Sequence, residues 1–433
     1  MSLFCSKGHR HLDGHKDLTK HQEIISLLEG ENAPKEVYFP TMSPNGKPIT
    51  FTVNVGDTVK VGTKIGTRTD FYVPIYSSVS GVVKEQKMIF SPQIGRAIQH
   101  VVIENDGQYV EEEPLKVVTL DSSKEEIFEA IKEAGLVGMG GAGFPTYIKY
   151  NNPSNIETLL VNGVECEPYL TTDFVAMQKE VDALLLGCEY LMKASGANQA
   201  IIAFKVHKEE VKEAISAKLN EHPKISMVEV PDQYPMGWER TLVKQVLHKE
   251  YDKLPSEANA VVNNAQTVIE LGKTLSTGKT VATRLVTVSG NGVKNPTNVL
   301  CPIGTLASEL IQACGGYEEG DINLIPGGPM CAKAVKQDDF PILIQMGSLT
   351  VLKFVAIHSE PCLRCGACTM NCPAGLQPVE LKIAFDRKDT DRMEKLNIMS
   401  CVECGMCSYI CPSKIELTET IKKAKMIYRL KKK

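Results

Sequence analysis

The spacing of the cysteines near the C-terminus constrains this chain more than any other feature. One run reads Cys362-Leu-Arg-Cys365-Gly-Ala-Cys368-Thr-Met-Asn-Cys372-Pro, and a second, 39 residues further on, reads Cys401-Val-Glu-Cys404-Gly-Met-Cys407-Ser-Tyr-Ile-Cys411-Pro. Both have the C-x2-C-x2-C-x3-C-P pattern of a two-cluster ferredoxin. The tandem copy, which again ends in Cys-Pro, predicts two [4Fe–4S] clusters and electron transfer in single-electron steps.

Each iron–sulfur cluster needs four thiolates, and in such pairs the last cysteine of each run serves the other cluster. We therefore assign Cys362, Cys365, Cys368 and Cys411 to one cluster, and Cys401, Cys404, Cys407 and Cys372 to the other. The main alternative is zinc, but structural zinc sites take their ligands in separated pairs rather than in threes followed by Cys-Pro. Disulfides are a weaker alternative, because no secretory signal is evident and a reducing cytosol suits thiolates.

The composition describes an ordinary globular protein of several domains, with 43% hydrophobic and 23% charged residues. Its 433 residues predict two to four domains, at about 150 residues each. A net charge of −4 gives no reason to expect nucleic acid, and no apolar run reaches the ~18 residues that span a bilayer. We expect a cytoplasmic protein, and the basic end of the chain leaves peripheral docking on a membrane open.

The N-terminal third contains two segments of different character. Residues 1–35 are polar and histidine-rich, and we expect an exposed arm, with a metal site as the alternative; the candidate ligands are Cys5, His9, His11, His15 and His21. Residues 36–118 alternate short strands with turns and resemble the barrel sandwich of lipoyl and biotinyl domains. Those domains carry a modified lysine at a hairpin tip. Residues 67–72 contain none, so we expect a structural module without a covalent swinging arm.

The remaining chain predicts three further units, and the fold class is therefore multidomain α/β. In residues 119–282, a capping box at Ser122 and Glu125 opens a helix that Gly135 ends. Strands are expected at 158–161 and 199–206, and helices at 174–193 and 207–219. Residues 283–335 predict a small β-grasp-like module with a short helix from 303 to 311. Residues 336–433 hold the cysteine runs and a closing helix over 417–430.

Two motifs in the α/β segment suggest a ligand site. The loop Gly138-Met-Gly140-Gly141-Ala-Gly143-Phe-Pro-Thr, with Lys149 beyond it, offers close backbone approach to a phosphate. Neither the dinucleotide fingerprint nor the P-loop fits its order and spacing, so a tight structural turn stays equally open. The second motif, Asn162-Gly-Val-Glu165-Cys-Glu-Pro, ends a predicted strand, where polar residues often line ligand crevices.

These motifs together with the cysteine runs resemble the RnfC family over nearly the whole chain. Its members are the NADH-side subunits of ion-pumping ferredoxin:NAD oxidoreductases. The resemblance implies the domain order of a barrel-sandwich hybrid, an α/β domain similar to the flavoprotein subunit of respiratory complex I, an SLBB-type insert and a ferredoxin domain. It also implies FMN and NADH in the α/β domain, and electron transfer through both clusters to a redox partner.

The resemblance further implies roles for single residues. Glu239 lies where the family has an acid near the nicotinamide, and Glu165 flanks the flavin with Asn162; these two glutamates are the catalytic candidates. The resemblance implies that Gly138, Gly140, Gly141 and Lys149 bind the phosphate and the ring edge of the flavin. It also implies a second flavin contact, made by Asn263, Asn264 and Thr267. A flavin suits this position because a hydride delivers two electrons together whereas a cluster accepts one.

Three departures from the family pattern leave other interpretations open. Trp238 precedes Glu239, where it would stack on a nicotinamide or block it. The segment 203–207 lacks the acidic pair of the family, and Cys331 replaces a methionine, which raises the hypothesis of a redox-active thiol. These changes suit a soluble relative similar to PrdC, the proline reductase-associated electron transfer protein, with little NADH activity. A conduit whose α/β domain binds no cofactor is a further alternative.

Overall fold

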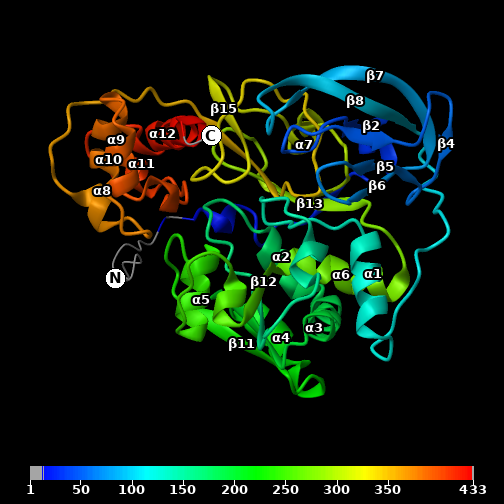
Figure 1. The fold of residues 1–433 in the computed structure, drawn as a ribbon. Coiled ribbons are helices and arrows are strands. Elements are labelled where there is room, and N and C mark those ends of the chain that lie inside the picture. The colour runs from blue at the N-terminus through cyan, green and yellow to red at the C-terminus, as the bar shows by residue number, and fades with distance from the viewer. Residues whose placement is uncertain (1–11, 13, 432–433) are drawn as a thin grey trace.

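The computed structural model describes residue 12 and residues 14–431 of the chain. In Figure 1 two β-rich units lie above an α/β domain, and a helical C-terminal domain lies at the left. The expectation of a multidomain α/β protein is confirmed.

The first β-rich unit is a sandwich of two small sheets. One sheet has the order β2-β8-β7-β4 and the other β3-β5-β6. Val37, Ile65 and Ile103 from the two sheets are fully buried between them. The β5–β6 hairpin, at the predicted tip, is tied down by Asp70, whose carboxylate accepts hydrogen bonds from Arg68 and Asn45. The strands are β2 (Glu36–Pro40), β3 (Ile49–Phe51), β4 (Thr58–Val59), β5 (Lys64–Arg68), β6 (Pro74–Tyr76), β7 (Gly81–Ser91) and β8 (Arg96–Asn105).

Parts of the N-terminal segment pack into the fold, so the expectation of an exposed arm is wrong for the stretches around Thr19 and Leu27, whereas residues 21–23 and 29–32 are exposed. Thr19 is fully buried and its hydroxyl lies 2.9 Å from that of Thr171. The short strand β1 (Ile25–Ser26) joins the second β-rich unit, and Leu27 is fully buried in the core of that unit. Burial of the apolar residues around Leu27 packs this stretch against the protein, although the segment as a whole is polar in composition. His15 stacks on Tyr169, whereas the candidate ligands Cys5, His9 and His11 lie outside the described residues.

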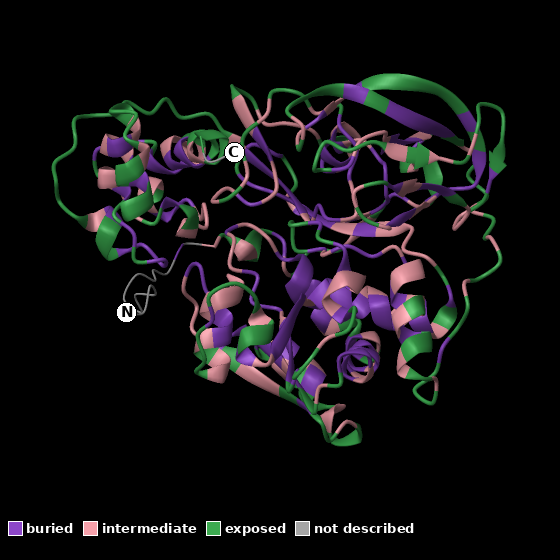
Figure 2. Cartoon of the chain, viewed as in Figure 1, coloured by how far each residue is buried: buried purple, intermediate pink, exposed green. Residues whose placement is uncertain are grey.

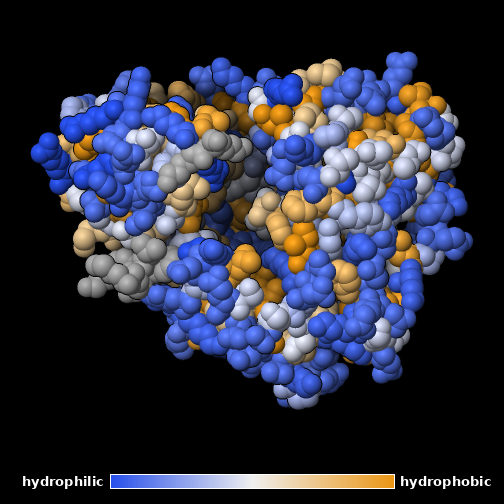
Figure 3. Space-filling model, viewed as in Figure 1, coloured by the Kyte–Doolittle hydropathy of each residue, from blue (hydrophilic) through white to orange (hydrophobic). Residues whose placement is uncertain are grey.

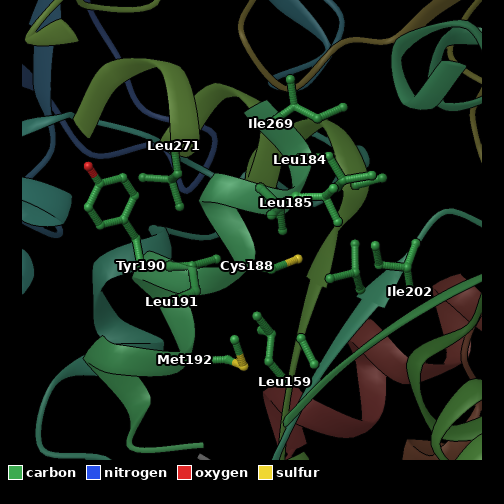
Figure 4. Packing of buried hydrophobic residues seen from close by; sticks show 14 of the residues in the cluster. Leu159, Leu184, Leu185, Cys188, Tyr190, Leu191, Met192, Ile202, Ile269 and Leu271 are labelled. Atoms are coloured by element: carbon green, nitrogen blue, oxygen red, sulfur yellow. The ribbon is translucent and has the colours of Figure 1, made fainter. Parts of the chain in front are cut away.

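The α/β domain is built on a four-stranded parallel sheet with the order β11-β10-β9-β12. In Figure 4 the residues of α3 and α6 pack with Leu159 and Ile202 of the sheet. Gly187 and Gly272 allow these helices to approach closely, because a Cβ atom at either would lie 2.1 Å from a carbonyl oxygen of the other helix. The strands are β9 (Thr158–Asn162), β10 (Gln199–Lys205), β11 (Ile225–Val230) and β12 (Ala260–Asn264). The helices are α1 (Lys124–Glu133), α2 (Thr172–Lys179), α3 (Val181–Ser195), α4 (Glu209–Ser216), α5 (Glu239–Leu247) and α6 (Ala265–Thr277).

The expected strands of this domain are confirmed, but two helix predictions need correction. The capping box lies one residue later, at Ser123 and Glu126, because the Ser122 hydroxyl instead accepts a hydrogen bond from the backbone N–H of Thr119. The helix expected over 174–193 is two helices, α2 and α3, which meet at Glu180 with a non-helical backbone.

The second β-rich unit is a five-stranded sheet with the order β1-β14-β13-β16-β15. Its core packs around α7 (Ala307–Ala313), which starts four residues later than the predicted helix. The sheet extends past the expected boundary at residue 335, because β16 is one of its strands. Besides β1 the strands are β13 (Thr283–Ser289), β14 (Thr297–Pro302), β15 (Ile322–Pro326) and β16 (Ser348–Lys353).

The C-terminal domain is helical, and its core contains Leu381, Met393, Ile421 and Ala424. Figure 2 shows an exposed stretch of chain at its outer edge, and residues 353–366 are all exposed. Figure 3 shows the molecule hollowed on this face between the C-terminal domain and the β-rich units. The helices are α8 (Ala367–Met370), α9 (Pro378–Asp386), α10 (Thr390–Lys395), α11 (Met406–Tyr409) and α12 (Leu417–Lys431).

Candidate functional site

The two motifs of the α/β domain meet at the carboxyl edge of the sheet. Strands β9 and β12 are parallel neighbours, and their register pairs Asn162 with Asn264. Polar side chains at this edge of a parallel sheet are a common setting for ligand sites. The sequence-predicted residues Asn162, Asn263 and Asn264 therefore lie together.

The glycine loop sits at the N-terminus of α6. The backbone N–H of Met139 donates to the Thr267 hydroxyl at 2.9 Å, which fixes the loop against the first turn of this helix. Asn264 caps the helix, because its side-chain oxygen accepts from the N–H of Gln266 at 3.1 Å. The N-terminus of a helix of 13 residues carries a partial positive charge that favours an anion.

The loop also leaves room for a ligand to approach its backbone. Gly141 has a φ of +103° and nothing within 4 Å of the position of a Cβ atom. A Cβ atom at Gly140 would lie 3.3 Å from the Asn264 side chain. Gly138 closes the loop by donating to the Phe144 carbonyl at 2.8 Å. The bare backbone and the helix N-terminus together fit the phosphate of a flavin nucleotide.

Lys149 and Glu239 are coupled electrostatically beside this edge. The Lys149 ammonium donates to the Val262 carbonyl of β12 at 2.5 Å. Burial lowers the pKa of Lys149, and the negative charge of Glu239 opposes that shift. Glu239 is the first residue of α5 and accepts a hydrogen bond from the Tyr251 hydroxyl at 2.9 Å.

Glu165 is buried, and one carboxylate oxygen accepts from the backbone N–H of Asp173 at 2.8 Å. The other oxygen lies 3.6 Å from the ammonium groups of both Lys16 and Lys208. Burial alone raises the pKa of Glu165, but the two lysines outweigh it and hold this pKa below its ordinary value. Nearby, the Asn162 amide donates to the Gly237 carbonyl at 2.8 Å.

Two buried residues that the sequence analysis missed form hydrogen bonds with the residues of this edge and of the glycine loop. Asp173 accepts hydrogen bonds from Asn264 at 2.8 Å and from Gln266 at 2.7 Å, and burial together with Glu165 raises its pKa to about 6. Arg284, from β13, is 1% exposed and donates to the Met139 carbonyl at 2.9 Å. No local sequence signal identifies Arg284, because its partners lie in distant segments.

Three cysteines of the second run and one cysteine of the first run line a common cavity; these residues are Cys401, Cys404, Cys407 and Cys372. They are the four cysteines assigned to one cluster from the spacing. The Lys425 ammonium is bound to the same loop, because it donates to the Cys401 carbonyl at 2.8 Å and to the Glu403 carboxylate at 2.6 Å. A cavity bordered by four thiols fits an iron–sulfur cluster.

The remaining four assigned cysteines differ in exposure. Cys362 and Cys365 are exposed, whereas Cys368 and Cys411 are buried together beside Leu417. The backbone N–H of Arg364 donates to the Cys362 sulfur at 3.4 Å, and that of Ile415 donates to the Cys411 sulfur at 3.5 Å. Backbone donors of this kind stabilise thiolate ligands of a cluster.

The α/β domain contacts the second cysteine run directly. The Tyr234 hydroxyl donates to the Cys404 carbonyl at 2.6 Å, and Tyr234 and Met406 are buried together. Gly405 packs so tightly that a Cβ atom there would lie 2.3 Å from the Met330 carbonyl oxygen. Trp238 packs against the core of the C-terminal domain. The side chain of Trp238 therefore serves the contact between these domains.

Cys331 lies at the same contact. Its sulfur is 3.3 Å from the Tyr234 hydroxyl. Cys331 as a whole is exposed, but the protein around its thiol and the negative charge of Glu167 raise the pKa of the thiol above its ordinary value. The thiol is therefore protonated at neutral pH, which is the less nucleophilic form of cysteine.

Four domain families match the chain in the order that the fold presents. They are the RnfC barrel sandwich hybrid domain over residues 5–108, the Nuo51 FMN-binding domain over 131–273, the SLBB domain over 285–334 and the 4Fe-4S dicluster domain over 355–415.

The chain is also similar to curated proteins over most of its length. One subunit of the proton-translocating ferredoxin:NAD(+) oxidoreductase complex of Clostridium ljungdahlii is 34% identical, over 89% of this chain and 86% of that protein. The chain belongs to the RnfC family. The corresponding subunit of the Na(+)-translocating ferredoxin:NAD(+) oxidoreductase complex of Acetobacterium woodii is 33% identical, over 90% of each chain. These relatives favour the RnfC interpretation over the PrdC-like one.

Membership of the RnfC family, with a flavin-binding and a dicluster domain, makes this chain an electron-transfer protein that uses FMN and [4Fe–4S] clusters. A solved NAD+-reducing [NiFe]-hydrogenase is similar at 18% identity with a TM-score of 0.49, over 63% of this chain and 54% of that one. Among the described residues, every helix is too short or too polar to cross a bilayer.

Proposed function

We propose that this RnfC-family chain passes electrons from NADH, through FMN at the carboxyl edge of the α/β sheet and then through two [4Fe–4S] clusters, to a protein partner. When bound, FMN takes up the two electrons of a hydride together and releases them singly to the clusters. The observation that carries this proposal is the hydrogen bond from the Tyr234 hydroxyl to the Cys404 carbonyl, which joins the flavin-binding domain to a cluster loop.

The flavin phosphate lies at the N-terminus of α6, where the bare backbone of the glycine loop and the helix dipole favour an anion. Lys149 supplies a positive charge at the same edge, and Glu239 and Glu165 are the acids beside the reacting end of the flavin. The residues proposed to hold FMN are Gly138, Gly140, Gly141, Lys149, Asn162, Asn263, Asn264 and Thr267.

The two clusters act in a fixed order. The cluster of Cys401, Cys404, Cys407 and Cys372 receives electrons first, because its loop packs on Tyr234 and Met330. The cluster of Cys362, Cys365, Cys368 and Cys411 receives them second, because two of its ligands, Cys362 and Cys365, are exposed. Since each run supplies one ligand to the other cluster, the two clusters are held close together.

The exposed segment over residues 353–366 is the proposed exit to the partner. It carries Val355, Ile357 and Leu363, which are 69%, 62% and 70% exposed, beside two cluster ligands. Large apolar side chains that are this exposed, beside cluster ligands, suit a protein contact. The named relatives are subunits of ion-translocating complexes, so we propose that the partner is another subunit of such a complex.

Anaerobic purification tests this function. The full chain is expected to contain one FMN and about eight irons, from two clusters of four irons each. Addition of NADH is expected to bleach the flavin absorbance and then to reduce the clusters. If dithionite reduces the clusters but NADH does not, the assignment of the donor fails. If the iron is present and flavin is absent after gentle purification, the chain is a conduit without its own flavin.

A further inference from the structure

Lysine side chains gather in an open hollow, at a place where the N-terminal segment crosses the α/β domain. Its walls come from residues 14–20 of this segment, from the start of α2, and from the end of β10 with the loop that follows. The described residues that line it include none from the glycine loop. The hollow is therefore separate from the proposed phosphate site of the flavin.

The hollow contains more basic than acidic side chains. The lysines that line it are Lys16, Lys20, Lys205 and Lys208. Two of them have carboxylate partners of their own, since Lys20 lies 2.9 Å from Asp17 and Lys205 lies 2.5 Å from Asp232. The other two share a single oxygen of Glu165, at 3.6 Å each. One carboxylate therefore faces two ammonium groups, of which Lys208 is buried and Lys16 is half-buried.

The Lys16 ammonium donates to the Leu170 carbonyl, but the hydrogen-bonding capacity of Lys208 and Glu165 is not fully used within the described chain. The Lys208 ammonium and the Glu165 oxygen that faces it have no hydrogen-bond partner there. Lys208 lies 5.0 Å from the centre of the Phe174 ring, which attracts a cation but accepts no conventional hydrogen bond. An ammonium group carries three donors, and leaving them unmade in a buried place is unfavourable.

The electrostatics agree with a missing negative charge. Burial lowers the pKa of Lys16 to about 8, although Glu165 opposes the shift. Burial lowers the pKa of Lys208 as well. A bound anion would raise both pKa values, because it stabilises the charged form of each lysine.

We propose that this hollow, which we call the lysine pocket, is a second anion site that binds a tetrahedral oxyanion of the phosphate class. Lys16 comes from the N-terminal segment, and Lys205 and Lys208 come from the end of β10 and the loop that follows, so the three would donate to different oxygens of the anion. The oxyanion is either free or part of a phosphate-bearing nucleotide such as NADH, since the recognition chemistry is the same. This inference stands independently of the proposed function.

Calorimetric titration of the purified full chain with inorganic phosphate, against sodium chloride of matched ionic strength, tests the proposal. The variant Lys205→Met is expected to bind phosphate about tenfold more weakly, which corresponds to about 1.4 kcal/mol. Lys212→Met is the matched control, because Lys212 lies on the adjacent α4 and pairs with Glu229. Binding no stronger than the chloride control, or equal binding by wild type and Lys205→Met, would overturn the proposal.

A second measurement needs no variant and uses sulfate, which does not titrate near neutral pH. Sulfate binding at pH 8 is expected to be accompanied by proton uptake, seen as a dependence of the heat on the buffer. The affinity is expected to fall as the pH rises through 8, because Lys16 loses its proton. The charged and titratable groups around Lys16 are Glu165, Lys208, Lys205, Cys166, Asp17, Lys20, Asp232, His15 and His207. Sulfate binding without proton uptake would contradict the proposal that the anion binds beside Lys16 in the lysine pocket.

Competition distinguishes the two sources of the oxyanion. If NADH displaces phosphate from wild type, the lysine pocket holds the phosphates of the nucleotide. If phosphate binds equally at saturating NADH, the pocket holds a free oxyanion. Both results support an anion site. Weaker binding by Lys205→Met is the result that places this site in the lysine pocket.

Discussion

The two cysteine runs have the same spacing but different surroundings. Arg364 and Glu403 occupy the same place in their runs, and both have a left-handed backbone, with φ of 54° and 58°. The glycines that follow the second cysteine of each run match as well, at 75° for Gly366 and 79° for Gly405. The surroundings of the two runs differ. The loop of Arg364 is exposed. Glu403 instead forms an ion pair with Lys425, and its loop packs on Tyr234.

This difference shows what ligand spacing leaves undetermined. Spacing sets the geometry around the metal, whereas the potential of a cluster also depends on nearby charge, hydrogen bonds and solvent. A duplicated motif therefore yields two unequal sites once one copy is covered by another domain. For electron transfer, the covered copy suits the internal acceptor and the exposed copy suits the contact with a partner.

The largest expected effect comes from removing one ligand of each run. Cys404→Ala should lower the iron content by about four irons per chain and should abolish electron transfer from NADH to any external acceptor. Cys365→Ala should lose a similar amount of iron but should keep the reduction of the remaining cluster by NADH. Iron analysis and electron paramagnetic resonance after NADH addition measure both. If NADH reduces a cluster in Cys404→Ala but not in Cys365→Ala, the order of the clusters is reversed.

The two clusters should lose their iron at different rates. The ligands Cys362 and Cys365 are exposed, so a chelator or oxygen should attack the first-run cluster several times faster than the second-run cluster. Loss of cluster signal followed over time should therefore have two phases of equal amplitude. A single phase for both clusters would show that exposure of the ligands does not control the loss of iron.

Lys425 should affect the potential of the second-run cluster only. Lys425→Met removes a buried charge and its hydrogen bond to the Cys401 carbonyl, an interaction of about 2 kcal/mol for a charged donor. The second-run cluster should become harder to reduce, while the first-run cluster should keep its potential. Redox titration is the measurement, and Lys423→Met, an exposed lysine on the same helix, is the control. An equal shift of both clusters would argue for a general effect of charge.

The smallest expected effect is that of Tyr234→Phe. This change removes one hydrogen bond to the Cys404 carbonyl, worth about 1 kcal/mol, and keeps the ring in place. The second-run cluster should become slightly harder to reduce, and electron transfer from the flavin should slow. Stopped-flow absorbance after mixing with NADH separates flavin reduction from cluster reduction. A change confined to the first-run cluster would contradict the contact with Tyr234.

Features that depend on short stretches of sequence were predictable. The cysteine runs, the glycine loop and the strands β9 and β10 of the parallel sheet each follow from residues close together in the chain. The capping box shows the limit, since Ser122 and Ser123 are each followed by a glutamate three residues later. The side chain of Ser122 is used by the turn before the helix, and sequence spacing does not reveal this competition.

Features that depend on contacts between distant segments were missed. Arg284 reaches Met139 across 145 residues, and Lys16 reaches Glu165 from the segment that its composition marked as an exposed arm. The break at Glu180 was also missed, because neither glycine nor proline marks it and apolar residues continue on both sides. Burial of charged groups is a property of the packed domains and has no signature in a single segment.

The pairing of β1 with β14 has a consequence for synthesis of the chain. Ile25 leaves the ribosome long before its partner Val299. At about 5 to 20 residues per second, the intervening chain takes roughly 15 to 55 s to translate. During that interval Leu27 has no completed sheet to cover it, so the growing polypeptide offers an apolar segment to chaperones near its leading end.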